Sequence, residues 1–322
     1  MKSICVLVTS AGVESAVNII KSLRLQSELV VEIIAFDVDR FASGLYLADH
    51  HYVSPPISDK ERYWKFICEI CQRHKIRALY PCYSKEIAFI AGKKEILKEM
   101  GIATLLPSCD VIALCDDKHA SIELAEKIGI PIPKVINNPR KEDIPVFSKP
   151  LKSSSSRGAA LIEDEHMLRY YLASGEERLY QEFIDGQEYT VDVLCDENAK
   201  AVFCGPRKRI SVKAGQTVKG VTVNNSIIND YVKRLCEKIG FIGVCNIQFM
   251  ERDGRYYFIE INPRYAAGGL MVTVHAGANL PLLALKLMMG IPVLPVETQH
   301  KANIVMTRYW KEIIIDSSPD SE

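Results

Sequence analysis

Hydrophobic and polar positions alternate in a regular way over the first hundred residues of the chain. Short apolar runs predict strands, and stretches with apolar positions three or four residues apart predict amphipathic helices. The apolar runs lie at residues 2–10, 30–39 and 76–84, and the helical stretches at 13–24 and 62–74. Strand–helix alternation of this kind predicts a doubly wound parallel sheet with right-handed crossovers.

Sheets of this type bind ligands beyond the carboxyl ends of their strands. In this sequence those ends fall close to Gly12, Asp37 and Ser84, and we expect Gly12 and Ser84 to face a ligand. A dinucleotide fingerprint needs three glycines to admit a pyrophosphate, and only Gly12 is present here. The pattern therefore favours a layer that supports a neighbouring site over a nicotinamide-binding domain.

The pattern changes after Pro107. Residues 115–133 contain a predicted helix, with Asp116 or Asp117 as its N-cap, Lys118 at its start and Gly129 at its end. The run VFSKP then predicts a short strand that ends in Lys149, and AALIED predicts the next strand. Two cations thus stand at the ends of neighbouring elements.

A serine-rich loop joins these two strands. Ser154, Ser155, Ser156 and Arg157 offer hydroxyls, backbone N–H groups and a cation, which suit a flexible cover over a phosphate chain. A serine run is also typical of a solvated linker, so both interpretations stay open.

The segment at residues 178–194, RLYQEFIDGQEYTVDVL, predicts a strand at residues 181–184, a turn at Asp185–Gly186 and then a second strand. Glu188 lies on one face of the second strand, where it either accepts hydrogen bonds from sugar hydroxyls or faces solvent. Further on, Arg207 and Arg209 share a strand face, and two adjacent guanidinium groups suggest a carboxylate or phosphate partner.

The stretch FIEINPRYAAGG, residues 258–269, places Glu260, Asn262 and Arg264 on one strand face. The preceding strand carries Gln248, and the size of the loop between the strands decides what Gln248 faces. A two-residue turn at Asp253–Gly254 pairs it with Ile259, whereas a three-residue loop, residues 253–255, pairs it with Glu260. We expect the three-residue loop.

That register brings three oxygen-bearing side chains together. Gln248, Glu260 and Asn262 then form a set of hard ligands with little protein charge, which suits Mg²⁺ shared with substrate phosphates. Arg264 would reach the same phosphates. A polar hairpin face in water is the alternative, and it does not explain the apolar residues around the set.

Composition limits the rest. The chain has 322 residues, 48% hydrophobic and 25% charged, which fits a globular protein of about two or three domains. Lys plus Arg and Asp plus Glu both number 40, so no net charge favours nucleic acid or an anionic membrane. Charge is therefore expected to act inside a local site.

Targeting and redox signals are weak. The start of the chain has no apolar run of secretory type, and the apolar stretch at residues 279–296 is broken by Lys286 and prolines, so we expect a core helix and a cytoplasmic protein. Ten cysteines without a repeating spacing suit a reducing compartment. Cys68, Cys71 and His74 have helical spacing, but buried thiols are favoured over a zinc site.

The order of the motifs DDK, FSKP, QEFIDGQEYT, NIQF and FIEINPR resembles that of ATP-grasp enzymes, in the branch similar to one synthetase unit of the carbamoyl phosphate synthase large chain. The resemblance spans nearly all of residues 1–310. It implies an α/β and α+β chain, with a pre-ATP-grasp domain of Rossmann-like topology at residues 1–110, a lid subdomain at 111–185 and a catalytic subdomain with a C-terminal tail at 186–322.

The resemblance also implies roles for single residues. Lys118 and Lys149 match basic residues that contact the ATP phosphates, and Arg264 matches the arginine that steadies the transferring phosphoryl group, so Lys149 and Arg264 are the expected catalytic residues. The remaining matches are the lid loop (Ser154, Ser155, Ser156, Arg157), the adenine hinge (Glu182, Ile184), the ribose carboxylate (Glu188) and the Mg²⁺ ligands (Gln248, Glu260, Asn262). Two features depart from many relatives: the loop has one glycine, and Gln248 replaces an acid.

The implied reaction is ATP-dependent joining of a small carboxylic acid, such as an amino acid, to an amine through an acylphosphate. The cofactors would be ATP and Mg²⁺. We expect Arg207 and Arg209 to grip the acid, with Gly12 and Ser84 closing the far side; no nucleic acid or membrane partner is expected, and a homodimer is an option. Two alternatives stay open, a synthetase that phosphorylates bicarbonate or carbamate and a nucleotide-binding protein without turnover.

Overall fold

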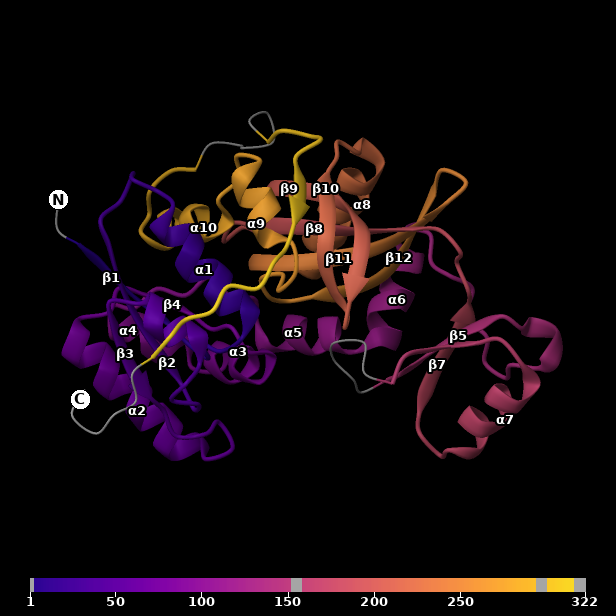
Figure 1. Cartoon of the computed structure of the whole chain (residues 1–322), viewed down its shortest axis with the longest axis horizontal. Coiled ribbons are helices and arrows are strands. Elements are labelled where there is room, and N and C mark those ends of the chain that lie inside the picture. Colours follow the sequence, from indigo (N-terminus) through magenta and orange to yellow (C-terminus); the bar gives the residue numbers. More distant parts are fainter. Residues whose placement is uncertain (1–2, 152–157, 294–299, 316–322) are drawn as a thin grey trace.

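The computed structural model describes residues 3–151, 158–293 and 300–315, and three sheets organise them (Figure 1). The N-terminal sheet has four parallel strands in the order β3-β2-β1-β4. Its elements are β1 (Ile4–Val8), α1 (Glu14–Arg24), β2 (Val31–Asp37), η1 (Ser43–Leu47), β3 (His50–Val53), α2 (Lys60–His74), β4 (Ala78–Tyr80), α3 (Ser84–Ala91) and α4 (Lys94–Glu99). The predicted doubly wound parallel sheet is confirmed.

Alternation along β1 explains why helices cover both faces of this sheet. Val6 and Val8 belong to a core cluster that includes Ile19 of α1, whereas Leu7 belongs to a cluster that includes Ile67 of α2. Successive side chains of a strand point to opposite faces, so a continuous apolar run is buried on both sides.

Two short helices link this sheet to the rest of the chain. They are α5 (Cys109–Asp116) and α6 (Lys118–Lys127), and both pack against β12. Of the two candidate N-caps, Asp117 is the one observed, because its carboxylate accepts hydrogen bonds from the amides of His119 and Ala120 at 2.9 and 3.0 Å.

A small antiparallel sheet with the order β6-β5-β7 stands apart at one end of the molecule (Figure 1). Its elements are η2 (Lys141–Asp143), β5 (Val146–Pro150), β6 (Ala160–Ile162), α7 (Glu165–Ala173) and β7 (Arg178–Glu182). Val146, Ile162 and Leu168 form its own small buried cluster.

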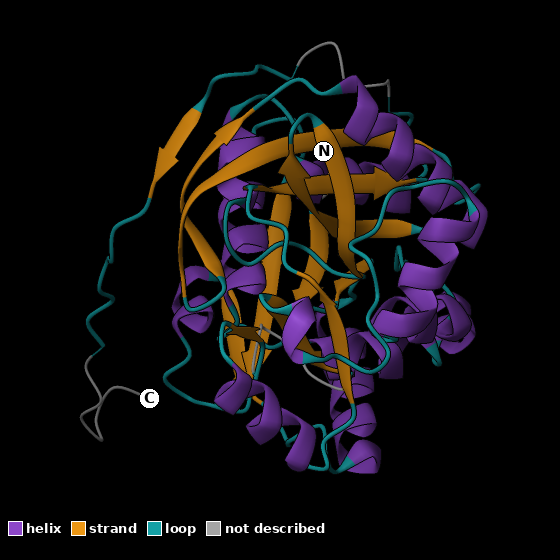
Figure 2. Ribbon diagram, turned by 90° about the vertical axis from the view of Figure 1, so that its right-hand side faces the viewer, coloured by secondary structure: helices purple, strands orange, loops and turns teal. Residues whose placement is uncertain are grey.

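The largest sheet is antiparallel and has six strands in the order β12-β11-β8-β9-β10-β13. Its elements are β8 (Gln187–Cys195), β9 (Ala201–Lys213), β10 (Gln216–Thr222), α8 (Ser226–Ile239), β11 (Gly243–Arg252), β12 (Arg255–Asn262), α9 (Leu270–His275), α10 (Leu280–Met288) and β13 (Val305–Thr307). The chain after β13 runs along the outside of the molecule (Figure 2), where Arg308 pairs with Glu14 of α1 at 3.1 Å.

The apolar stretch near the end of the chain is the core helix α10, as predicted, with five of its leucine and alanine side chains buried. None of the helices in the described part of the chain combines the length and apolar character needed to cross a membrane. The ten cysteines, all in the described part of the chain, form no disulfide bonds, and seven of them are buried.

Candidate functional site

A cavity of about 970 Å³ lies between the small sheet, the large sheet and helices α3, α5 and α6. Most of the residues singled out from the sequence line it. The charged and polar lining residues include Ser84, Lys85, Asp116, Lys118, Lys149, Glu182, Glu188, Arg209, Gln248, Glu260, Asn262 and Arg264. Residues that are far apart in the chain are therefore brought to one space.

The hairpin β11–β12 carries the core of this site. Gln248 pairs with Glu260, as predicted. The predicted reason is wrong: the turn has two residues, Asp253 and Gly254, both with positive φ, and the extra residue is instead Ile259, in a β-bulge between the pairs at Gln248 and Phe249. One residue inserted in the strand shifts the register as an odd loop would.

Asn262 and Glu260 lie against each other within this hairpin. The Asn262 amide group donates to the Glu260 carboxylate at 3.0 Å, which leaves the Asn262 oxygen as a free acceptor for an ion. Asn246, the register partner of Asn262, donates to the backbone oxygen of Arg264 at 3.0 Å. The oxygens of Gln248, Glu260 and Asn262 therefore fit the preference of Mg²⁺ for hard ligands.

Lys149 on β5 reaches across to the same hairpin. Its ammonium group donates to the carbonyl oxygen of Ile259, the bulge residue, at 3.1 Å. Burial lowers the pKa of Lys149 to about 8, while the Glu260 carboxylate raises it and the Lys118 ammonium lowers it. The side chain is 4% exposed.

Lys118 and Arg264 resemble Lys149 in their electrostatics. Burial lowers the pKa of each, and the carboxylates of Glu260 and Asp116 act in the opposite direction on both. Lys118 also donates to the Leu151 carbonyl oxygen at 3.2 Å. Three partly desolvated cations, Lys118, Lys149 and Arg264, thus line the same cavity. This arrangement suits the binding of a polyanion.

The other part of the cavity is mainly apolar. Glu182 is the last residue of β7, and Ile184, which is 4% exposed, lies in the connection that follows it. The strand predicted at residues 181–184 begins and ends earlier, at Arg178 and Glu182. Lining residues of this part are Pro133, Phe147, Leu151, Phe183, Ile184 and Met250, and apolar walls with a few polar groups are typical of a site for a flat organic ring.

Glu188 lines the cavity, but it is not unpaired. Arg209 forms a short ion pair with it and also donates to Thr217 and to the Gly215 carbonyl at 3.0 and 2.7 Å. Burial raises the pKa of Glu188, and the Arg209 guanidinium lowers it. A hydroxyl that binds Glu188 would join an existing network.

The geometry contradicts the expectation that Arg207 grips a substrate. Its side chain is 1% exposed and is absent from the cavity lining, and its Nε lies 2.9 Å from Asp192 Oδ2. Thr273 also donates to Asp192, at 2.5 Å. The sequence of β9 alone does not show which residue of the neighbouring strand pairs with Arg207. That partner is Asp192 of β8, which is buried in the protein interior.

The N-terminal sheet contributes less than expected. Gly12 does not line the cavity. Its backbone amide donates instead to the carboxylate of Asp37, at the end of β2, at 2.7 Å. Glu86 is likewise occupied, by the hydroxyls of Thr9 and Tyr63 at 2.5 Å each. Ser84, at the start of α3, does line the cavity. The N-terminal domain thus contributes few residues to the cavity and mainly supports the neighbouring site.

Four predicted residues lie outside the described part of the chain: Ser154, Ser155, Ser156 and Arg157. Lys85, which follows Ser84, also lines the cavity. Sequence reasoning overlooked the lining residues Asp116 and Met250 and the buried Asn246. A signal existed for Asn246, which stands two positions before Gln248 and so shares its strand face. None existed for Asp116, whose position depends on how α5 packs against β12.

Two family models match the chain. The model described as PylC-like, N-terminal domain, matches residues 6–105, and the model described as ATP-grasp in the biosynthetic pathway with Ter operon matches residues 174–310. The first covers the parallel sheet, and the second covers the large sheet with the hairpin that carries Gln248, Glu260 and Asn262.

Among curated proteins, the chain is similar to carbamoyl phosphate synthase large chains. It is 27% identical over 219 residues to that of Clostridium perfringens, which covers 61% of this chain and 20% of the relative. It is 29% identical over 221 residues to the large chain of Archaeoglobus fulgidus, a match that covers 60% of this chain and 20% of the relative. The chain thus spans about one fifth of the length of these relatives.

Among solved structures, the chain is similar to biotin carboxylases. The biotin carboxylase domain dimer of Hydrogenobacter thermophilus 2-oxoglutarate carboxylase, in complex with MgADP, ADP and bicarbonate, superposes with a TM-score of 0.71 at 18% identity, covering 93% of this chain and 73% of the other. The Campylobacter jejuni biotin carboxylase–β-γ-ATP complex superposes with a TM-score of 0.71 at 19% sequence identity, and the match covers 93% of this chain and 74% of the other. At this identity the likeness establishes the fold.

Proposed function

We propose that this chain, a member of the ATP-grasp superfamily, binds ATP with Mg²⁺ in the cavity and joins a small carboxylic acid to an amine through an acylphosphate. One observation carries the proposal: Gln248, Glu260 and Asn262 line the same cavity as Lys149 and Arg264. An oxygen ligand set opposite buried cations is what a metal-bound triphosphate requires.

The shape of the cavity supports an orientation for the nucleotide. The adenine ring fits the apolar part near Ile184 and Met250, which leaves the triphosphate to run toward Lys118, Lys149 and Arg264. Glu188 also lines the cavity and is the candidate acceptor for the ribose hydroxyls. The loop with Ser154, Ser155, Ser156 and Arg157 is assigned to cover the phosphates, on the resemblance alone.

The residues supply positioning and charge rather than bond-making, as is usual in phosphoryl transfer. Lys149, held by the Ile259 carbonyl, and Arg264, held near Asp116, would neutralise charge that develops on the transferring group. When bound between Gln248, Glu260 and Asn262, Mg²⁺ adds neutralisation of the phosphate oxygens. The carboxylate substrate supplies the attacking oxygen, and the amine later displaces phosphate.

The acid substrate belongs at the end of the cavity that faces the N-terminal sheet. Ser84 and Lys85 of α3 are the lining residues on that side, and Arg209 of β9 also lines the cavity. A hydroxyl and an ammonium group suit an amino acid or another small acid. Arg207 and Gly12 are omitted from this role, because both are engaged internally.

A second candidate follows from the curated relatives, which are named carbamoyl phosphate synthase large chains. On this reading the chain phosphorylates bicarbonate or carbamate. The match covers about one fifth of those relatives, so the reaction of a whole synthase is not assigned to this chain.

Phosphate release from Mg-ATP tests the proposal. The protein is incubated with pooled amino acids and amines, and separately with bicarbonate and ammonia. We expect acid-dependent release in the first mixture and a loss on the order of 10²- to 10³-fold in Arg264→Ala. Release that requires bicarbonate favours the second candidate, and no release with any acid favours a nucleotide-binding protein without turnover. Unchanged release by Arg264→Ala would contradict the site assignment.

The same proposal includes the domain organisation. We assign residues 1–110 to the pre-ATP-grasp domain, 111–185 to the lid subdomain and 186–322 to the catalytic subdomain with its tail. A homodimer and a cytoplasmic location are proposed with it. Mass photometry of the purified chain would test the dimer.

A further inference from the structure

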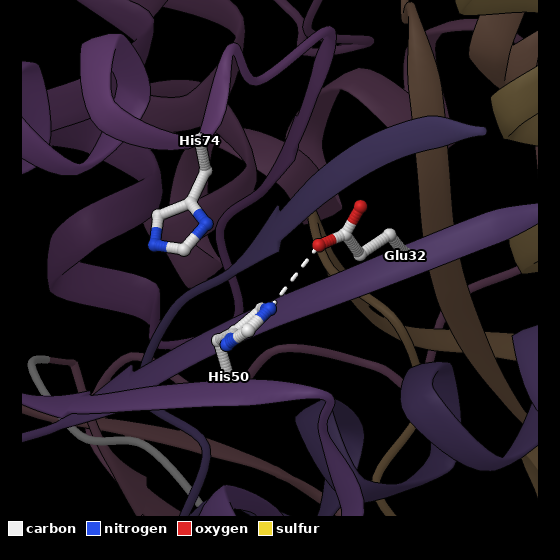
Figure 3. Close-up of side chains that lie close together, drawn as sticks. All are labelled: Glu32, His50 and His74. Carbon is white, nitrogen blue, oxygen red and sulfur yellow. Dashed lines mark ion pairs between the residues drawn. The ribbon is translucent and has the colours of Figure 1, made fainter. Parts of the chain in front are cut away.

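A second group of possible metal ligands lies on the N-terminal sheet, and none of its residues lines the cavity. Glu32 of β2, His50 of β3 and His74 at the end of α2 converge there, and Figure 3 shows the three side chains together. One ligand atom from each lies within 4.8 Å of the others. Within residues 3–151, 158–293 and 300–315, no other trio of His, Cys, Asp or Glu side chains meets this distance.

The group is partly assembled. His50 Nε2 lies 3.2 Å from Glu32 Oε1, and the imidazole rings of His50 and His74 lie 5.0 Å apart with a tilt of 40°. Two donors about 2.1 Å from a tetrahedral zinc are about 3.4 Å from each other. The His50–Glu32 pair already has that spacing. The ligand atom of His74 lies within 4.8 Å of the other two, so small side-chain rotations would bring all three within reach of one ion.

Neighbouring groups orient the ligands. The Tyr52 hydroxyl lies 2.7 Å from Nε2 of His74, which leaves Nδ1 for an ion. Figure 3 shows one ring nitrogen of His74 turned toward Glu32 and the other turned away from it. The Cys5 thiol donates to Glu32 Oε2 at 3.4 Å, so Oε1 is the oxygen that faces His50. Outer partners of this kind fix the direction of metal ligands.

The surroundings allow an ion to enter. His50 is 49% exposed, whereas Glu32 and His74 are half-buried. Two further charged groups lie nearby: the Arg73 guanidinium, 5.6 Å from the Tyr52 ring centre, and the carboxylate of Asp49, the residue before His50, which pairs with Arg24 at 2.8 Å.

We propose that Glu32, His50 and His74 form a binding site for a borderline divalent cation of the zinc type, with solvent in the open position. Two imidazoles and one carboxylate are a ligand set that Zn²⁺ accepts, whereas Mg²⁺ prefers oxygen ligands only. The bound ion ties the edge strand β3 and the end of α2 to β2. It therefore stabilises the N-terminal sheet and lies outside the cavity that we assign to the nucleotide.

Zinc titration of the full chain tests this proposal. Isothermal titration calorimetry with Zn²⁺ is performed in saturating Mg²⁺, on the parent and on His50→Ala and Glu32→Gln. We expect one site in the parent and at least tenfold weaker binding in both variants. His51→Ala is the matched control, since His51 is the next exposed residue of β3 and points to the opposite face of the strand; it should bind like the parent.

A second measurement separates binding from folding. Since the ion binds only the folded sheet, Zn²⁺ should raise the melting temperature of the parent and of His51→Ala, but not that of His50→Ala. His50 is exposed, so its variant should melt near the parent without zinc. Equal zinc affinity and equal thermal shifts in all four proteins would overturn the site, as would a parent that binds no zinc.

Discussion

The ammonium group of Lys149 donates a hydrogen bond to the backbone carbonyl of Ile259, 3.1 Å away. Ile259 is the extra residue of the β-bulge that sets Gln248 opposite Glu260. A single inserted residue therefore sets the register of the proposed ligands and supplies the acceptor that holds a cation next to them. Bulges commonly redirect groups beside functional sites in this way.

Nucleotide affinity should fall at alkaline pH because Lys149 loses its proton. Burial lowers the pKa of Lys149 to about 8, and the phosphates need its charged form. The dissociation constant for MgADP should be level below that pH and rise up to about tenfold per pH unit above it. Lys149→Arg keeps its charge throughout, so it should show a level profile. A parent whose affinity does not change up to pH 9.5 would refute this role.

Above about pH 8, where nucleotide affinity should fall, the stability of the unliganded protein should instead rise. The folded pKa of Lys149 is lowered below the usual 10.5, so between about pH 8 and 10.5 the unfolded chain binds more protons. The unfolding free energy of the parent, relative to Lys149→Met, should therefore increase with pH in this window, by up to about 1.4 kcal/mol per unit. Urea denaturation at pH 7.5 and 9.5 measures the difference; equal differences at both pH values would count against the shifted pKa.

Arg207 should matter for stability rather than for substrate binding. Arg207→Met leaves the buried Asp192 without its cation, and loss of one partner of a buried pair costs about 3–5 kcal/mol. Replacing both partners, as Arg207→Met with Asp192→Leu, should recover much of that loss. Chemical denaturation of the single and double variants checks this. A single variant as stable as the parent would mean that the pair does not hold β8 and β9 together.

Gly186 should tolerate no side chain. A Cβ atom at this position would lie 1.9 Å from the Glu251 carbonyl oxygen, so Gly186→Ala must displace the turn between β7 and β8. That turn connects Ile184 with Glu188, and the variant should raise the dissociation constant for MgADP while it lowers the melting temperature. Gly92→Ala is the control, because its nearest atom, the Phe89 carbonyl oxygen, lies at 3.5 Å. Parent-like binding by Gly186→Ala would exclude the turn from the site.

Local patterns were sufficient for much of the fold. Apolar periodicity predicts the parallel sheet, and α10 follows from its apolar run. The position of the residue that shifts the hairpin register was not readable, because a bulge in β12 and an odd loop place Gln248 opposite Glu260 equally well. The two-residue turn with positive φ at Asp253 and Gly254 had a sequence signal in the Asp–Gly pair.

Charged residues were harder to interpret than apolar ones. Arg207 and Arg209 share a strand face, yet one is paired with Asp192 in the interior and the other with Glu188 at the cavity wall. The difference depends on which neighbours β8 and β9 bring to each arginine, and strand pairing is not contained in a single-strand pattern. Asp116 shows the same limit, since helix packing alone brings it to the cavity.

Manganese binding tests the central claim most directly, because Mn²⁺ replaces Mg²⁺ and is visible by electron paramagnetic resonance. In the presence of a non-hydrolysable ATP analogue, the parent should bind Mn²⁺ that it does not bind without nucleotide. Glu260→Gln keeps the size of the side chain but removes the charge of the proposed ligand set, and it should lose at least tenfold in this nucleotide-dependent affinity while melting like the parent. Nucleotide-dependent Mn²⁺ binding of equal strength in both proteins would contradict the account.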